Sequence, residues 1–288
     1  HVYLADGESG GKAPVNELSV ISLFSGSKGN CTLVTAGGDR ILIDAGRTAR
    51  AVVRALESAG CGIEEISAIF VTHEHCDHVS ALPVLTKKYG IPVHMTEKSA
   101  KAMTVPDGCP LKSCLTAHDG EFSVKLSCGA EVTAFDVPHD SRECVGYRVS
   151  YSGSSVGIVT DIGYVTEKVC TMLSGCETVM IEANHDREMV RKGSYPEALK
   201  QRILSGGGHL SNSDCAALAS MLCADGTKHI ILAHLSEENN TPEAALGAVG
   251  KALSGSGADI VAVCGDRVTA APCGHECEAG RELIGCLT

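Results

Sequence analysis

The sequence has 288 residues, of which 44% are hydrophobic and 20% are charged, as is typical of a globular protein with one large domain or two small ones. The formal net charge of −11 argues against a surface that is basic overall and binds nucleic acid, although a local basic site remains possible. No apolar run approaches the roughly 20 residues that cross a bilayer, so we expect no contact with a membrane.

Apolar, β-branched runs that end at Gly or Asp turns predict strands, and helical patterns alternate with them. The predicted strands are 18–24, 31–35, 40–44, 66–72, 121–127, 130–137, 144–150, 155–160, 176–182, 228–233 and 259–263. The predicted helices are 47–59, 79–89, 164–173, 195–204, 212–223 and 242–253. Pro196 is tolerated at a helix start, and Ser211 or Asn212 is a candidate N-cap.

These elements begin as hairpins and continue as strand–helix alternations, with no long linker, repeat or break in composition. The pattern predicts one α/β domain over residues 17–270. Its expected architecture is a sandwich of two mixed sheets with helices on both outer faces, an αββα arrangement.

Both ends of the chain lie outside this predicted domain. Residues 1–16 are polar and Gly-rich, and we expect a tag remnant or a disordered N-terminus without a signal peptide. The 15 Cys residues are irregularly spaced and odd in number, which favours reduced thiols in the cytoplasm. Residues 271–288 form a Cys-rich tail. Cys273, His275, Cys277 and Cys286 could bind a metal there, but a flexible tail that happens to contain Cys is the favoured interpretation.

The most informative segment is Phe70-Val71-Thr72-His73-Glu74-His75-Cys76-Asp77-His78, where an apolar strand runs directly into histidines and carboxylates. So many polar groups at a strand end would be costly to desolvate without a shared partner. Imidazole and carboxylate together suit zinc, manganese or iron. A corner between strand and helix would let His73 and His75 point one way and Asp77 and His78 another, which predicts two adjacent metal sites. A solvated, His-rich loop is the weaker alternative.

Three further candidate ligands follow predicted apolar strands. They are His139 in Val137-Pro138-His139-Asp140, Asp161 in Val159-Thr160-Asp161-Ile162-Gly163, and His234 in Leu232-Ala233-His234-Leu235-Ser236. A strand that ends in Asp44 precedes the His cluster. A single His after a strand is more often structural, but the ordered set indicates a metal centre.

Taken together, these segments resemble the signature of the metallo-β-lactamase superfamily. The resemblance implies that one metal ion is held by His73, His75 and His139, a second by Asp77, His78 and His234, and that Asp161 bridges them. It implies that Asp44 orients the metal loop without being a ligand. It also implies hydrolysis, because the redox-active diiron branch carries Glu at the position of His75. The expected cofactors are two divalent ions, zinc, manganese or iron, which polarise an oxygen and supply a nucleophile.

Further segments are similar to the YycJ/WalJ family of bacterial proteins over roughly residues 18–265. They are Ser25-Gly26-Ser27-Lys28-Gly29-Asn30, Asp161-Ile162-Gly163-Tyr164-Val165-Thr166, Glu182-Ala183-Asn184-His185-Asp186, Gly208-His209-Leu210-Ser211-Asn212 and His234-Leu235-Ser236-Glu237-Glu238-Asn239-Asn240. This resemblance implies a cytoplasmic 5′→3′ exonuclease on DNA, linked to DNA repair, with a metal-bridging hydroxide as the attacking group. It also implies a functional link to a two-component system, beside whose genes the encoding gene often lies.

Several residues are candidates for substrate contacts. Ser25, Ser27 and Asn30, in a Gly-rich turn after a strand, could form an anion-binding nest, with an ordinary tight turn as the alternative. His185 could donate to a phosphate oxygen or protonate a leaving oxygen, or it could be a core histidine. His209 is a weaker candidate of the same kind.

Two more interpretations concern charged side chains. Asp77 could orient the attacking hydroxide or accept its proton, which makes it a catalytic candidate together with His185. A set of basic residues could contact phosphates, but we interpret it as a solvated surface. This set is Lys28, Arg187, Arg191, Lys192, Lys200 and Arg202.

Three alternative functions remain open. An RNA-processing phosphodiesterase of this fold usually inserts a long arm for tRNA, and no such insertion stands out. A glyoxalase II-like thioesterase would carry a C-terminal helical domain, and none is visible. A non-catalytic regulatory partner of a two-component kinase would have lost metal ligands, whereas all the expected ones are present.

Overall fold

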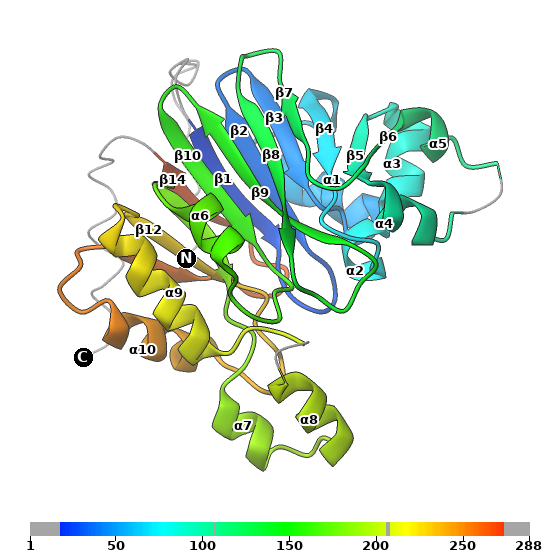
Figure 1. Cartoon of the computed structure of the whole chain (residues 1–288). Helices are drawn as coiled ribbons and strands as arrows, with labels where there is room; N and C mark the ends of the chain where they lie inside the picture. The colour runs from blue at the N-terminus through cyan, green and yellow to red at the C-terminus, as the bar shows by residue number, and fades with distance from the viewer. Residues whose placement is uncertain (1–17, 106–107, 206–207, 274–288) are drawn as a thin grey trace.

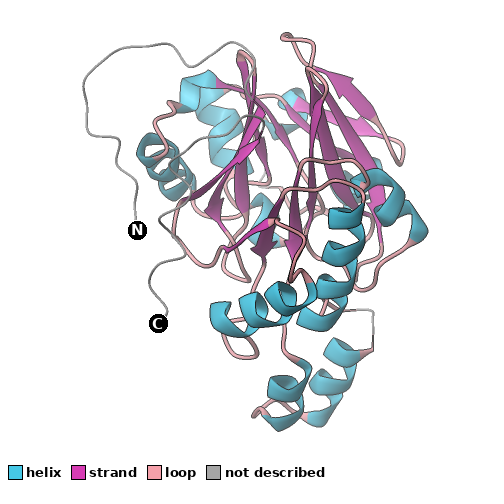
Figure 2. Cartoon of the chain, turned by 90° about the vertical axis from the view of Figure 1, so that its left-hand side faces the viewer, coloured by secondary structure: helices cyan, strands magenta, loops and turns pink. Residues whose placement is uncertain are grey.

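The structure, a computed structural model, describes residues 18–105, 108–205 and 208–273. In this part of the chain two β-sheets pack face to face, and helices cover their outer faces (Figure 1). The layers are also visible in the view of Figure 2, where helices flank the strands. This arrangement confirms the predicted αββα sandwich.

The first sheet combines the N-terminal half of the chain with one strand from the C-terminal end. Its strands in spatial order are β14 (Thr269–Cys273), β1 (Leu18–Phe24), β2 (Cys31–Ala36), β3 (Asp39–Ile43), β4 (Ile66–Phe70), β5 (Val93–Thr96) and β6 (Leu115–His118). Neighbours from β14 to β3 are antiparallel, and neighbours from β3 to β6 are parallel. The parallel strands therefore end at one common edge.

The second sheet repeats this pattern. Its strands in spatial order are β13 (Asp259–Ala262), β12 (His229–Ala233), β11 (Thr178–Glu182), β10 (Ser154–Val159), β9 (Cys144–Tyr151), β8 (Glu131–Val137) and β7 (Ser123–Lys125). Neighbours from β7 to β10 are antiparallel, and neighbours from β10 to β13 are parallel. Because β9 runs opposite to both of its neighbours, β8 ends at the same edge as β10.

Helices complete the core on both sides. Those beside the first sheet are α1 (Ala49–Ser58), α2 (Cys76–Val79), α3 (Leu82–Tyr89), α4 (Glu97–Ala102), α5 (Leu111–Cys114) and the short 3₁₀ helix η1 (Ile63–Glu65). Those packed on the second sheet are α6 (Glu167–Leu173), α9 (Asn212–Ala224) and α10 (Pro242–Ala252). In β11 every residue is buried, with Val179 and Ile181 facing the helices and Met180 facing the other sheet. This double burial explains the uninterrupted apolar run in the sequence.

Two short helices form a hairpin away from the sandwich. They are α7 (Arg187–Lys192) and α8 (Glu197–Leu204), and both views place them beyond the edge of the main body (Figures 1 and 2). α8 has no fully buried residue. The hairpin thus contributes little to the core and lies beside the strand ends.

Most predicted elements are present, but several boundaries were wrong. The helix expected at 164–173 begins at Glu167, because the Thr166 side chain accepts a hydrogen bond from Val169 N and caps it there. The helix expected at 79–89 is divided into α2 and α3. β5, β6, β14, α4, α5, α7 and η1, which are all short, were not predicted.

The ends of the predicted domain also differ from the structure. β14 covers residues 269–273 and pairs with β1, so the expected boundary at residue 270 falls inside a strand. The predicted N-terminal tag (1–16) lies outside the described residues, as do His275, Cys277 and Cys286 of the tail. No disulfide joins the Cys side chains that the structure describes. Within the described ranges, no helix combines the length and apolar character needed to cross a membrane.

Candidate metal centre

The predicted ligands come from strand ends at one edge of the sandwich. His73, His75, Asp77 and His78 follow β4, His139 follows β8, Asp161 follows β10 and His234 follows β12. Parallel strands deliver the residues after their carboxyl ends to a common edge, where ligands of open α/β sheets typically bind. The fold therefore brings segments from both sheets together here.

Three residues at this edge have left-handed backbone conformations. The φ angles are 63° at Asp44, 55° at Asp161 and 55° at His234. A non-glycine residue in this region costs about 1–3 kcal/mol, and such residues cluster at functional sites. The conformation reorients each side chain sharply at its strand end.

The side chains of the predicted ligands converge in two groups. One potential ligand atom from each of His73, His75 and His139 lies within 4.8 Å of the others, and the same holds for Asp77, His78 and His234. Each group combines residues that follow a strand of the first sheet with one residue that follows a strand of the second sheet. Two further groups overlap with these, His73 with His78 and Asp161, and Asp161 with Glu182, His209 and His234.

Asp161 lies between these groups. Its Oδ2 is 3.2 Å from His78 Nε2, and its Oδ1 is 3.6 Å from His234 Nε2 and 3.8 Å from His139 Nε2. The carboxyl group is fully buried, which raises its pKa, but the surrounding histidines more than offset burial and hold the pKa well below its usual range. Asp161 therefore supplies a negative charge at the position expected of a bridging ligand.

The buried atoms of the site have the pattern expected of metal ligands. His73 Nε2, His139 Nδ1 and His234 Nε2 are buried, and none has a hydrogen-bond partner among the described residues. Buried polar atoms without a partner are rare because desolvation is costly. Imidazole nitrogens and carboxylate oxygens are ligands of zinc, manganese and iron. The residues therefore fit divalent metal ions.

In three of the candidate ligand histidines, the ring nitrogen Nδ1 lies within hydrogen-bond distance of an oxygen atom. His73 Nδ1 lies 3.0 Å from Thr72 Oγ1, His78 Nδ1 lies 2.7 Å from Asp44 Oδ2, and His234 Nδ1 lies 2.8 Å from Glu182 Oε1. Metal-binding histidines usually have such a partner, which sets the ring orientation and leaves the other nitrogen for the ion.

Asp44 has the contacts expected of a residue that orients the metal loop. It is 2% exposed, and its carboxylate accepts hydrogen bonds from Thr72 N (2.8 Å) and from Thr72 Oγ1. Its Oδ2 also contacts His78. These contacts connect the end of β3 to Thr72, which directly precedes His73, and to His78. They favour the predicted role of Asp44 in orienting the segment that carries the candidate ligands.

Glu182 was not among the predicted site residues. Its side chain is completely buried, and Oε2 accepts hydrogen bonds from Ile162 N (2.7 Å) and Leu210 N (3.3 Å). Its Oε1 contacts both His209 Nδ1 (2.7 Å) and His234 Nδ1 (2.8 Å). Burial raises the pKa of Glu182, but the two histidines lower it to about 2, so the group is a carboxylate. An acidic residue ending an otherwise apolar strand was the available signal.

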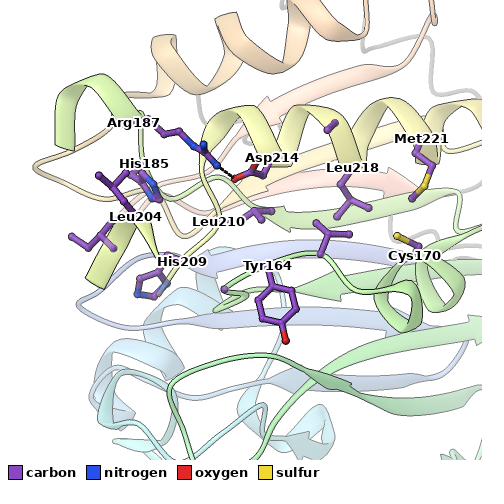
Figure 3. A pocket seen from close by; sticks show the side chains of 14 residues that line it. Tyr164, Cys170, His185, Arg187, Leu204, His209, Leu210, Asp214, Leu218 and Met221 are labelled. Carbon is purple, nitrogen blue, oxygen red and sulfur yellow. Dashed lines mark hydrogen bonds and ion pairs between the residues drawn. The ribbon is translucent and has the colours of Figure 1, made fainter. Parts of the chain in front are cut away.

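His185 and His209 line a cavity of about 450 Å³ beside the centre (Figure 3). His209 Nδ1 is 3.7 Å from Asp161 Oδ1, and although burial lowers its pKa, Glu182 and Asp161 raise it above the ordinary value. His185 is 2% exposed, and its buried Nδ1 has no hydrogen-bond partner. Burial lowers the pKa of His185 to about 4, so this imidazole is neutral near neutral pH.

Side chains of the Gly-rich turn after β1 contact residues of the candidate metal centre. Ser25 Oγ accepts a hydrogen bond from His234 N (2.8 Å), and the Asn30 side-chain amide lies 3.3 Å from Asp77 Oδ2. Asn30 Oδ1 accepts from Gly26 N (3.0 Å), and Ser27 is exposed. Because Ser25 and Asn30 are used within the protein, these contacts favour a structural role for both. Their binding to substrate stays a prediction.

Comparison with known proteins agrees with this geometry. Residues 39–235 match the family model described as beta-lactamase superfamily domain. The chain is 38% identical to exodeoxyribonuclease YycJ of Bacillus anthracis, over 82% of this chain and 89% of that protein. It is 36% identical to exodeoxyribonuclease WalJ of Streptococcus pneumoniae serotype 2 (strain D39 / NCTC 7466), over 77% of this chain and 83% of that protein.

Solved structures support the fold. The metallo-beta-lactamase fold protein YhfI from Bacillus subtilis superimposes with a TM-score of 0.66, covering 89% of this chain and 100% of that one at 14% identity. At this identity the likeness concerns the fold alone.

Proposed function

Since this chain belongs to the beta-lactamase superfamily, in the family of the exodeoxyribonucleases YycJ and WalJ, we propose that it is a metal-dependent exodeoxyribonuclease. Its reaction would be hydrolysis of phosphodiester bonds at the 5′ end of a DNA strand. The observation that carries the proposal is the convergence of the candidate ligands in two adjacent groups at one sheet edge.

In this proposal the centre holds two divalent ions, zinc, manganese or iron. His73, His75 and His139 would hold one, Asp77, His78 and His234 the other, and Asp161 would bridge them. Such ions lower the pKa of a bound water and stabilise the charge on the attacking and leaving oxygens. The geometric support is that Asp161 contacts residues of both groups.

The chain's own side chains have separate tasks around the scissile phosphate. The Asn30 amide holds Asp77 Oδ2, so this carboxylate is positioned to orient water or to accept its proton. The neutral His185 is suited to donating a hydrogen bond to a phosphate oxygen, and less suited to acting as an acid, because its pKa is about 4. His209, whose Nδ1 lies 2.7 Å from Glu182 Oε1, would face the phosphate with its other ring nitrogen.

Hydrolysis of linear DNA tests the proposal. Purified protein is incubated with a 5′-labelled linear duplex, with and without Mn²⁺, and its metal content is measured in parallel. We expect labelled mononucleotide from the first time points, and we expect a His75→Ala variant to lose both metal and activity. Full activity of that variant without metal would refute the proposal.

The same preparation separates the alternative functions. A tRNA precursor and a glutathione thioester serve as substrates for the RNA-processing and thioesterase alternatives. Preferential cleavage of either would replace DNA as the substrate, and a bound metal with no hydrolysis of any substrate would favour a regulatory protein. The cytoplasmic location, the role in DNA repair and the link to a two-component system stay predictions.

A further inference from the structure

The cavity of about 450 Å³ beside the centre has a polar end and an apolar end (Figure 3). His185, Arg187 and His209 lie toward one end, and Leu218, Met221 and Cys170 toward the other. Cavities of this size with mostly apolar walls and a few polar groups typically bind small molecules. This division suits a ligand that carries a flat apolar group and an anionic group.

The cavity exposes side chains that a globular protein normally buries. Tyr164 is 55% exposed and Met221 is 38% exposed. Of the four large hydrophobic residues that are exposed in the described part of the chain, these two line the same cavity. Concentrated exposed apolar surface indicates a binding site. An accessible tyrosine ring also offers a face on which a nucleobase can stack.

The polar end contains a group that lacks a partner. His185 Nδ1 is buried and makes no hydrogen bond within the described residues. Beside it, Arg187 is fixed by Ser211 Oγ (3.1 Å) and Asp214 Oδ2 (2.7 Å), while its side chain remains 48% exposed. An orphan imidazole and a preoriented guanidinium suit a phosphate group, which accepts several hydrogen bonds.

The cavity adjoins the candidate metal centre at His209. His209 lines the cavity, and its Nδ1 lies 3.7 Å from Asp161 Oδ1. Tyr164 follows Asp161 by three residues, and the intervening Gly163 N donates to Pro138 O (2.7 Å), which ties this loop to the residue before His139. A nucleotide in the cavity would therefore lie next to the centre.

We propose that this cavity binds the terminal nucleotide of a DNA strand, with its base on Tyr164 and a phosphate facing His185 and Arg187; this inference rests on the proposed exodeoxyribonuclease function. The walls come from α6 (Cys170), α8 (Leu204) and α9 (Leu218). A volume of about 450 Å³ between three helices suits one nucleotide better than a continuing strand. The cavity thus restricts cleavage to strand ends.

Binding of deoxyadenosine monophosphate, measured by calorimetry on the full chain with and without Mn²⁺, tests the proposal. We expect Tyr164→Ala to weaken binding about tenfold or more, the loss expected for one base–aromatic stack, and Tyr164→Phe to retain it. Ala217→Phe should also weaken binding, because Ala217 lines the cavity and a larger side chain there would fill the cavity. Ala217 is exposed, so the substitution should not disturb the core. Val84→Ala, at another exposed hydrophobic residue, is the matched control.

Two further ligands identify what the cavity recognises. Deoxyribose 5-phosphate lacks the base, so we expect Tyr164→Ala to leave its binding unchanged. Octanoate has a carboxylate and an apolar chain but no base. Tight binding of octanoate with none of deoxyadenosine monophosphate would overturn the proposal, as would equal nucleotide binding by wild type, Tyr164→Ala and Ala217→Phe.

The nuclease assay separates failure of this inference from failure of the proposed function. If Tyr164→Ala and Ala217→Phe release nucleotides from duplex ends at the wild-type rate, the assignment of the cavity is wrong. The proposed exodeoxyribonuclease function is then retained. If the wild type degrades no DNA but binds the nucleotide through Tyr164, the exonuclease is wrong and the nucleotide site stands.

Discussion

At the scale of single residues, buried carboxylates organise the candidate ligands. The carboxylate of Asp44 contacts Nδ1 of His78, and the carboxylate of Glu182 contacts Nδ1 of both His234 and His209. A buried carboxylate is costly to desolvate, and Glu182 offsets this cost with two backbone amides and two imidazoles. Its position in the core is therefore explained by the histidines it orients.

We predict that Glu182→Gln lowers metal affinity and activity about 10- to 100-fold, the usual effect of losing a partner of a metal-binding histidine. The amide keeps the shape of the side chain but has one acceptor oxygen instead of two, so it cannot hold both imidazoles and both backbone N–H groups. Metal content after dialysis against a metal buffer and the rate of nucleotide release are the measurements.

Glu177→Gln is the matched control for this change. Glu177 lies just before β11 and pairs with the exposed Lys228, away from the centre. We expect it to retain metal and activity. If Glu182→Gln retained them equally well, the orienting role of Glu182 would be wrong.

At the scale of elements, the turn between β1 and β2, the loop between β3 and α1 and the start of α2 are packed backbone against backbone. Asn30 N donates to Asp77 O (2.8 Å), and Gly46 N donates to Asn30 O (2.9 Å). A Cβ atom at Gly46 would lie 1.4 Å from Asp77 O. Only glycine allows α2, which carries Asp77 and His78, to approach this closely.

We predict that Gly46→Ala displaces α2 and weakens metal binding, with a loss of about 1–3 kcal/mol in the free energy of unfolding, as is typical of overpacking. Chemical denaturation and metal titration measure the two effects. Gly38→Ala, in the turn between β2 and β3, is the control because its Cβ would meet nothing within 4 Å. Equal metal affinity in the two variants would contradict the account of Gly46.

The same elements explain what the sequence could predict. His73 to His78, His139, Asp161 and His234 each follow a strongly apolar strand, so their shared edge could be inferred from strand ends alone. Tyr164 could not be found this way, and for Glu182 the strand end indicated an acidic residue in an apolar strand but not its role. The role of Glu182 depends on contacts with residues 20 to 52 positions away, and Tyr164 was assigned to a helix that begins three residues later. β14 was missed because its pairing with β1 joins distant parts of the chain.

At the scale of the whole molecule, the candidate centre joins the two sheets. His73, His75, Asp77 and His78 follow β4 of the first sheet, whereas His139, Asp161 and His234 follow strands of the second. Away from this edge the sheets are held by an apolar core that includes Phe70 and Tyr147. Bound ions would therefore act as cross-links at one edge of an otherwise complete sandwich.

We predict that removing the metal lowers thermal stability but leaves the fold intact. An ion that binds only the folded chain at about 100 times its Kd contributes about 2.7 kcal/mol. For a domain of this size that corresponds to a shift in Tm of about 5–10 °C, measured by calorimetry with and without a chelator. The far-UV circular dichroism at 20–25 °C should not change, because the apolar core does not depend on the ions.

A His139→Ala/His234→Ala variant, which lacks a ligand from each group, should show a much smaller shift in Tm. An identical Tm in the presence and absence of metal would mean that the two sheets are not joined through these residues.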